Sequence, residues 1–130
     1  MKITQELLDD LTAKAKASPR LRMNMDLRNS PEDQSQRMLN AIEPGSEVPI
    51  HRHRLSSETV VCLRGRLVEE YYDEAGSVVD SIELAPCGPV VALNIPAGQW
   101  HTVHSLESGT VILEVKDGPY VPQAEEDVMR

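Results

Sequence analysis

The chain has 130 residues, of which 40% are apolar and 26% are charged, the composition of a folded globular domain rather than of a disordered chain. Its net charge of −8 argues against non-specific binding to nucleic acid, and no apolar run is long enough for a membrane span. The first ten residues turn acidic where a secretory leader would be apolar. We therefore expect one cytoplasmic domain with neither a nucleic-acid nor a membrane partner.

Residues 4–17 are predicted to form one amphipathic helix, because apolar residues recur at helical spacing and Ser18-Pro19 follows them. After a polar loop at 29–36, the pattern changes to short β segments separated by turn residues. We expect strands near 37–43, 47–53, 58–64, 66–72, 78–84, 90–95, 100–105 and 110–116. Many short strands at even spacing favour a mainly all-β sandwich or small barrel, with the helix packed outside it.

Two histidines stand two residues apart in the predicted strand 47–53. Side chains at this spacing point to the same face of a strand, so His51 and His53 project together. A turn follows, and Glu58 can begin the adjacent strand with its carboxylate beside both imidazoles. Two nitrogens and one oxygen on a rigid sheet suit a first-row transition-metal ion.

A second stretch supplies a further imidazole. Pro96 and Gly98 predict a tight turn, after which His101 is the first residue able to return to the interior. The candidate metal ligands are therefore His51, His53, Glu58 and His101, and the alternative is a polar opening that holds no metal. By strand alternation His104 and Trp100 face away from His101. This favours a surface or interface histidine and a tryptophan that packs against the N-terminal arm or a partner.

The first half of the chain is basic and the second half acidic. Residues 1–66 carry 11 Lys/Arg and 9 Asp/Glu, a net of +2, whereas residues 67–130 carry 2 and 12, a net of −10. Arg20, Arg22 and Arg64 are candidates to bind a carboxylate or phosphate near the metal, because a guanidinium matches both groups. The alternative is that these arginines neutralise the acidic half across strands or across a dimer interface.

These residues carry a resemblance to the cupin superfamily, whose first motif is G-x5-H-x-H-x3-4-E-x6-G and whose second is G-x5-P-x-G-x2-H-x3-N. The chain matches the first motif at Gly45, His51, His53, Glu58 and Gly65. It matches the second at Pro96, Gly98 and His101, and departs from it at Val90 and Ser105. The chain also resembles the WbuC-like cupin metalloproteins of bacterial O-antigen gene clusters through SPRLR (18–22), QRMLNAIEPG (36–45), LRGRL (63–67), IPAGQWHTV (95–103) and GPYVP (118–122).

The resemblance implies a cupin-type double-stranded β-helix, a jelly-roll barrel, with an N-terminal α-helix. Within one domain it divides the chain into a helix and arm (1–36), the cupin barrel (37–122) and a tail (123–130), which we expect to fray at its end. It also implies one bound divalent transition-metal ion (Fe, Mn, Ni or Zn) and a homodimer.

Two functional hypotheses follow. In the first, the protein is a metal-dependent enzyme acting on a small anionic metabolite, such as a sugar or nucleotide sugar of bacterial surface polysaccharide metabolism; isomerase, lyase, hydrolase and oxygenase chemistry all remain open. In the second, it is a non-catalytic metal- and ligand-binding module or sensor. Residues 1–44 offer one helix and a loop, which is too little for a DNA-binding helix-turn-helix, so a sensor would need a partner protein for its output.

Overall fold

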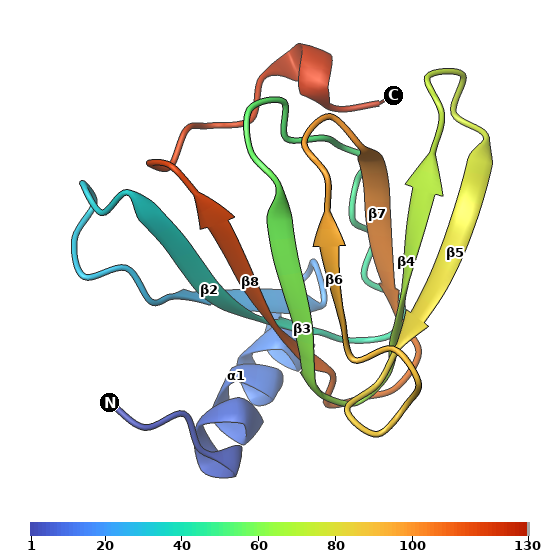
Figure 1. Ribbon diagram of the computed structural model, residues 1–130. Coiled ribbons are helices and arrows are strands. Elements are labelled where there is room, and N and C mark those ends of the chain that lie inside the picture. Colours follow the sequence, from blue (N-terminus) through green and yellow to red (C-terminus); the bar gives the residue numbers. More distant parts are fainter. Residues whose placement is uncertain (130) are drawn as a thin grey trace.

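Two antiparallel sheets and one α-helix make up the computed structural model, which describes residues 1–129 (Figure 1). The elements are α1 (Gln5–Ala17), β1 (Arg22–Asp26), β2 (Ser35–Ile42), β3 (Glu58–Arg64), β4 (Leu67–Tyr72), β5 (Val78–Leu84), β6 (Ala92–Ile95), β7 (Trp100–Ser105), β8 (Val111–Asp117) and the 3₁₀ helix η1 (Glu125–Asp127). One sheet has the order β1-β2-β8-β3-β6 and the other β5-β4-β7. The prediction of a mainly β fold with one N-terminal helix is confirmed.

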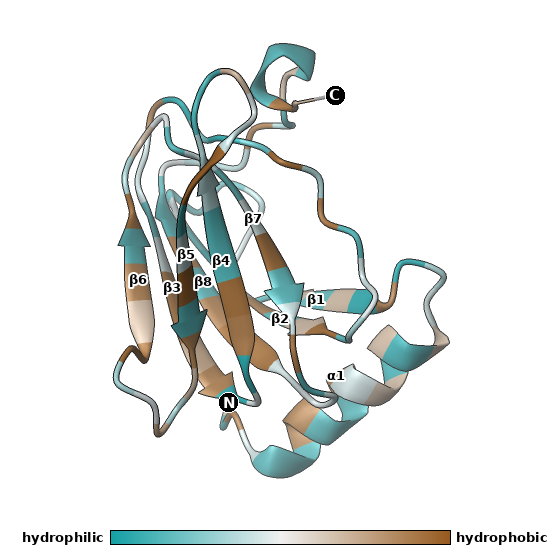
Figure 2. Cartoon of the chain, turned by 90° about the vertical axis from the view of Figure 1, so that its right-hand side faces the viewer, coloured by the Kyte–Doolittle hydropathy of each residue, from teal (hydrophilic) through white to brown (hydrophobic). Residues whose placement is uncertain are grey.

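The closed barrel of the prediction is not confirmed. Within residues 1–129 no ladder joins the two sheets into one, so β1 and β6 end the first sheet and β5 and β7 end the second. The apolar core lies between the sheets, where Ile42, Leu67 and Ile112 are fully buried. Figure 2 shows the hydrophobic stretches concentrated in the strands. The predicted homodimer stays a prediction, for which β1 offers an unpaired strand edge.

Two segments differ from the prediction. Residues 22–26, assigned to the N-terminal arm, form β1, which pairs with β2 from Arg22↔Ile42 to Asp26↔Met38. Residues 47–53 were predicted as a strand but form none, because Pro49 lacks the N–H that a ladder requires. This segment instead meets β7 through a single bridge between His51 and His101.

Helix α1 packs across the outer face of the first sheet, against β1 and β2. Thr4 caps it by accepting a hydrogen bond from the Leu7 N–H at 3.1 Å. Its buried side chains, which include Leu11 and Ala15, join a second apolar cluster with Leu39 of β2. In the part of the chain that the structure describes, no helix is long and apolar enough to cross a membrane.

The C-terminal segment returns to the end of the fold that carries the first histidine motif (Figure 1). Asp127 accepts a backbone hydrogen bond from Arg52 at 3.0 Å, and Met129 donates one to Ile50 at 2.8 Å. Val128 bridges to His51. The backbone of the tail is bonded to the chain through Met129. Fraying was expected at its end, and Arg130 lies outside the described residues.

Gly65 of the turn between β3 and β4 allows this turn to pass close to Thr110. It adopts φ +83°, and an added Cβ would overlap the Thr110 side chain and lie 2.6 Å from its Cα. We predict that Gly65→Ala lowers the free energy of unfolding by about 3 kcal/mol, because left-handed strain and steric overlap add. Urea unfolding measures this change.

Gly118→Ala is the matched control for Gly65→Ala. Gly118 has a similar φ of +89° but open space around the missing Cβ. Gly118→Ala should lower the free energy of unfolding only by the strain contribution, about 1–2 kcal/mol. Equal losses in both variants would contradict the role assigned to the contact with Thr110.

Candidate metal centre

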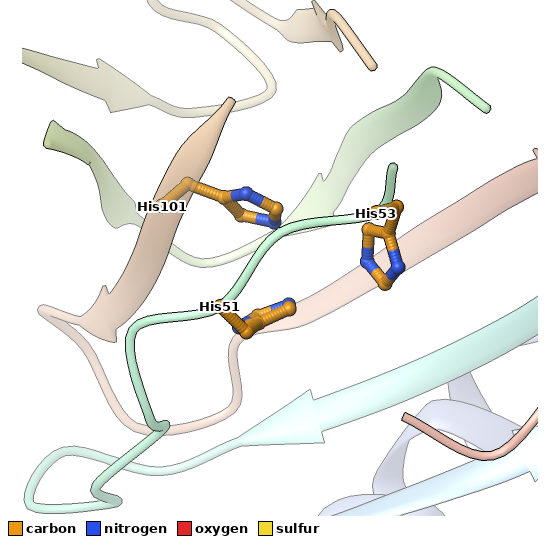
Figure 3. Close-up of side chains that lie close together, drawn as sticks. All are labelled: His51, His53 and His101. Atoms are coloured by element: carbon orange, nitrogen blue, oxygen red, sulfur yellow. The ribbon is translucent and has the colours of Figure 1, made fainter. Parts of the chain in front are cut away.

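Three imidazoles converge at one end of the fold. Ligand atoms of His51, His53 and His101 all lie within 4.8 Å of one another, so this group could hold a metal ion. His51 and His53 come from the segment between β2 and β3, whereas His101 comes from β7 (Figure 3). The backbones of His51 and His101 exchange two hydrogen bonds of 3.0 and 2.9 Å, which bring the two rings to 4.3 Å between centroids.

Backbone carbonyls orient two of the three rings. Nδ1 of His51 lies 2.8 Å from the Pro49 carbonyl oxygen, and Nδ1 of His101 lies 2.9 Å from that of Gln99. A carbonyl only accepts, so each Nδ1 carries the proton and each Nε2 keeps a free lone pair. Histidine ligands of metals are commonly held by such a second hydrogen bond. The two rings are therefore presented to an ion through Nε2.

His53 is held between two charged side chains. Its Nε2 lies 2.9 Å from Oε2 of Glu58, and its Nδ1 lies 3.2 Å from the Lys116 ammonium, which only donates. Nδ1 therefore accepts and Nε2 donates to Glu58. Oε2 of Glu58 is also 3.8 Å from Nε2 of His101, so the carboxylate adjoins the imidazole group. An ion on Nε2 of His53 would replace the proton there, and Lys116 would then have to release Nδ1.

The electrostatics of the group favour neutral imidazoles and an ionised carboxylate. Burial, followed by the neighbouring His101, lowers the pKa of His51 from 6.5 to about 4. Burial also lowers the pKa of His101. Burial by itself would raise the pKa of Glu58, but the hydrogen bond from His53 and the nearby imidazoles outweigh it, so this pKa is lowered. Neutral imidazole and carboxylate are the forms that bind metal ions.

A cavity of about 720 Å³ opens beside His51, His53 and Glu58. Its cationic side chains are those of Arg37, Arg52, Arg54 and Lys116. Apolar side chains of Leu55, Tyr120 and Val121 also line it, and all three are well exposed. The cavity thus combines positive charge close to the histidines with an apolar rim, and its volume suits a small metabolite.

Glu69 and Glu114 are two acidic residues that the motif analysis did not single out. Glu114 of β8 lines the cavity, and burial followed by the charge of Glu58 raises its pKa to about 8. Glu69 of β4 is 2% exposed, its Oε2 has no hydrogen-bond partner among the described residues, and burial raises its pKa well above the usual value. The available signal was strand alternation, because Glu114 shares its strand face with the buried Ile112.

The three arginines predicted to bind substrate do not line this cavity. Arg64 donates to Asp9, Thr12 and the Gly109 carbonyl, and so ties α1 to the sheet. Arg22 donates to the Glu47 carbonyl at 2.9 Å. The carbonyl of the exposed Arg20 accepts a hydrogen bond from Ser46. The cationic residues that line the cavity are instead Arg37, Arg52, Arg54 and Lys116.

His104 and Trp100 lie outside the histidine group. His104 is exposed, and its Nε2 is 2.7 Å from Glu70. Trp100 is buried, with the Arg52 guanidinium 4.4 Å from its ring centroid. The tryptophan therefore packs under the first motif. It was expected to pack against the N-terminal arm or a partner.

The fold and the site together define a class of protein. The capsular polysaccharide assembling protein CapF from Staphylococcus aureus superposes with a TM-score of 0.69 at 18% identity, covering 86% of this chain and 32% of CapF. KdgF from Halomonas sp. superposes with a TM-score of 0.61 at 15% sequence identity, covering 79% of this chain and 84% of KdgF. Oxalate decarboxylase from Bacillus subtilis superposes with a TM-score of 0.59 at 19% identity, covering 84% of this chain and 27% of the decarboxylase. These are cupin-fold proteins, and the chain shares their fold.

The particular family follows from the sequence. The chain belongs to the family described as Domain of unknown function (DUF6016), whose model matches residues 3–84. That range includes His51, His53 and Glu58 and ends before His101. No curated protein matches the chain significantly. The chain spans about a third of the length of CapF.

Titration of Glu114 makes the stability of the metal-free protein depend on pH. A carboxyl group whose folded pKa is about 8 and whose ordinary value is 4.5 stabilises the fold below 4.5, and this contribution is lost as pH rises through 8. Glu114→Gln cannot ionise. We predict that its melting temperature rises relative to the parent protein between pH 5 and pH 9, measured by calorimetry in the presence of a chelator.

Glu32→Gln is the control, because Glu32 is an exposed carboxylate of the loop before β2. This variant measures the effect of removing one carboxylate charge from the surface of the fold. A flat difference for Glu114→Gln would show that Glu114 ionises normally in the folded state.

Proposed function

We propose that this protein is a metal-dependent cupin enzyme that acts on a small anionic metabolite. One observation carries the proposal: three imidazoles with oriented rings and the Glu58 carboxylate adjoin a cavity that Arg37 and Lys116 line. A site for binding alone would not require ionisable groups with strongly shifted pKa values beside the ligand set. Glu114 has such a value.

The donor set fits a divalent first-row transition metal. Imidazole nitrogens suit Zn, Cu, Fe and Ni, and a carboxylate oxygen extends the range to Mn. His51, His53, His101 and Glu58 would hold the ion. When bound, it would supply Lewis-acid polarisation and a template for orienting the substrate.

The residues of the cavity wall would bind the anion and move protons. Lys116 stands closest to the metal group, at 3.2 Å from His53, and would pair with a carboxylate or phosphate once it releases Nδ1. Arg37 adds a second positive charge to the wall. Glu114 is largely protonated at neutral pH, so its carboxyl oxygen can donate a proton to a substrate in the cavity.

Sugars and sugar derivatives are the substrate class that we propose. The support is the resemblance to WbuC-like cupins of O-antigen gene clusters, together with a fold shared with CapF, itself a capsular polysaccharide assembling protein. A cavity of about 720 Å³ is large enough for a nucleotide sugar or a sugar phosphate.

The ligand assignment is tested by metal content. We predict that His51→Ala and His101→Ala each lose stable metal binding but keep the fold, because the core between the sheets is aliphatic. Elemental analysis after anaerobic purification measures the content and also identifies the metal. His104→Ala, which removes a histidine outside the group, should keep full metal content. Full content in the first two variants would refute the assignment.

The anionic substrate class is tested by a binding and turnover screen. Metal-loaded protein is incubated with organic acids, sugar phosphates and nucleotide sugars, and binding and conversion are followed by NMR. Lys116→Met should weaken binding of an anionic hit about tenfold, the cost of losing one charged hydrogen bond. Neutral sugars serve as the matched control. Absence of both binding and conversion across the anions would overturn this function.

A further inference from the structure

The histidines of the first motif stand on a segment with little secondary structure of its own. Residues 47–57 contain no strand, and His51 takes part in two isolated bridges, one to His101 and one to Val128. One edge of the segment therefore pairs with β7, and the other pairs with the C-terminal segment. A carbonyl in the first motif, that of His53, also accepts the Gly98 N–H at 2.7 Å.

Asp127 connects the C-terminal segment to this motif by both its backbone and its side chain. Its carbonyl accepts the Arg52 N–H at 3.0 Å. Its Oδ1 accepts from Nε of Arg52 at 3.0 Å and from Nε of Arg54 at 2.6 Å. One carboxylate oxygen thus joins two arginines that alternate with His51 and His53.

The side of the first motif that contacts Asp127 is packed as well as charged. The Arg52 guanidinium lies over the Trp100 ring and reaches Glu74 at 3.7 Å. The Asp127 side chain is 15% exposed, so its pairs with the arginines are only partly screened by water. Hydrogen bonding to Arg54 lowers the pKa of Asp127, which keeps it charged at neutral pH.

We propose that Asp127 is a positioning residue for the metal centre. By joining Arg52 to Arg54, its carboxylate holds the backbone of residues 51–54 in the conformation that turns both imidazoles toward His101. The inference rests on the proposed metal-binding function. It also assigns a role to the C-terminal segment. Asp127 follows residues 51–54 by 73–76 positions, and its side chain contacts their arginines rather than the proposed ligands.

The physical basis is pre-organisation. A segment without a ladder gains its order from a few contacts. When one contact is lost, the two ligand rings sample more conformations in the metal-free protein. Binding an ion then costs more conformational entropy. Groups that orient metal ligands from the outer shell typically contribute about 10- to 100-fold in affinity. Asp127 acts on the two neighbours of His53, so we expect an effect near the lower end.

The experiment compares the full-length parent protein with Asp127→Ala, Asp127→Asn and Asp127→Glu. Co²⁺ is titrated into chelator-treated protein, and both the affinity and the visible absorption spectrum are recorded. Asp127→Ala should bind about tenfold more weakly with an altered spectrum, and Asp127→Glu should restore part of both. Asp127→Asn keeps the hydrogen-bond acceptor without its charge, and should fall between them.

Asp33→Asn is the matched control for Asp127→Asn. Asp33 is similarly exposed, at 18%, and its carboxylate likewise pairs with an arginine, Arg37. Asp33 and the histidines lie on different segments, and the variant should keep the affinity and spectrum of the parent protein. An equal loss in this control would attribute the effect to general destabilisation and overturn the positioning role.

Amide hydrogen exchange of the metal-free proteins separates this proposal from the metal-binding function. The amides of His51 and Arg52 should exchange faster in Asp127→Ala, while those of β3 stay unchanged. Faster exchange in Asp127→Ala with no Co²⁺ binding by the parent would support the hold of Asp127 on residues 51–54 and overturn the metal function. Unchanged exchange and unchanged Co²⁺ affinity in Asp127→Ala would overturn the role of Asp127 alone. A parent that binds no Co²⁺, together with unchanged exchange, would overturn both.

Discussion

The candidate metal centre depends on the pair of backbone hydrogen bonds between His51 and His101. These two bonds join a segment without a strand to β7, and they bring together histidines that stand 50 positions apart in the chain. Each ring is then oriented by a nearby carbonyl, that of Pro49 or of Gln99. A further backbone hydrogen bond, from the Gly98 N–H to the His53 carbonyl at 2.7 Å, also joins the two motifs.

The interior beside this pair contains several ionisable side chains. Glu58, Glu114 and Lys116 lie on neighbouring positions of β3 and β8, and Glu69 is buried in β4. Burying carboxyl groups costs stability unless they are protonated or paired, and here the pKa values move in both directions. Glu58 is ionised beside the imidazoles, whereas Glu114 holds its proton. Two carboxyl groups with opposite shifts are the usual arrangement for proton transfer in an enzyme site.

Ion pairs between distant segments bring charges of the basic half of the chain against charges of the acidic half. Arg52 and Arg54 of the basic half meet Asp127 of the acidic half at the histidine motif. Arg64 instead meets Asp9, within the same half, and attaches α1 to the sheet. Pairing with the acidic half is therefore realised by Arg52 and Arg54, whereas Arg64 pairs within its own half. Of the three arginines of the cavity wall, Arg52 and Arg54 flank the histidines in sequence.

Most of the elements and the candidate ligands could be predicted from the sequence, but β1 and the lack of a strand at 47–53 could not. Helical spacing, strand alternation and the spacing of His51, His53, Glu58 and His101 are local properties, and the structure brings these four side chains together. The tertiary structure alone decided which charges meet. The contact of Asp127 with the motif leaves no local pattern, because it depends on the pairing of segments far apart in the chain. Electrostatic interactions follow distance in space, and a sequence records distance only along the chain.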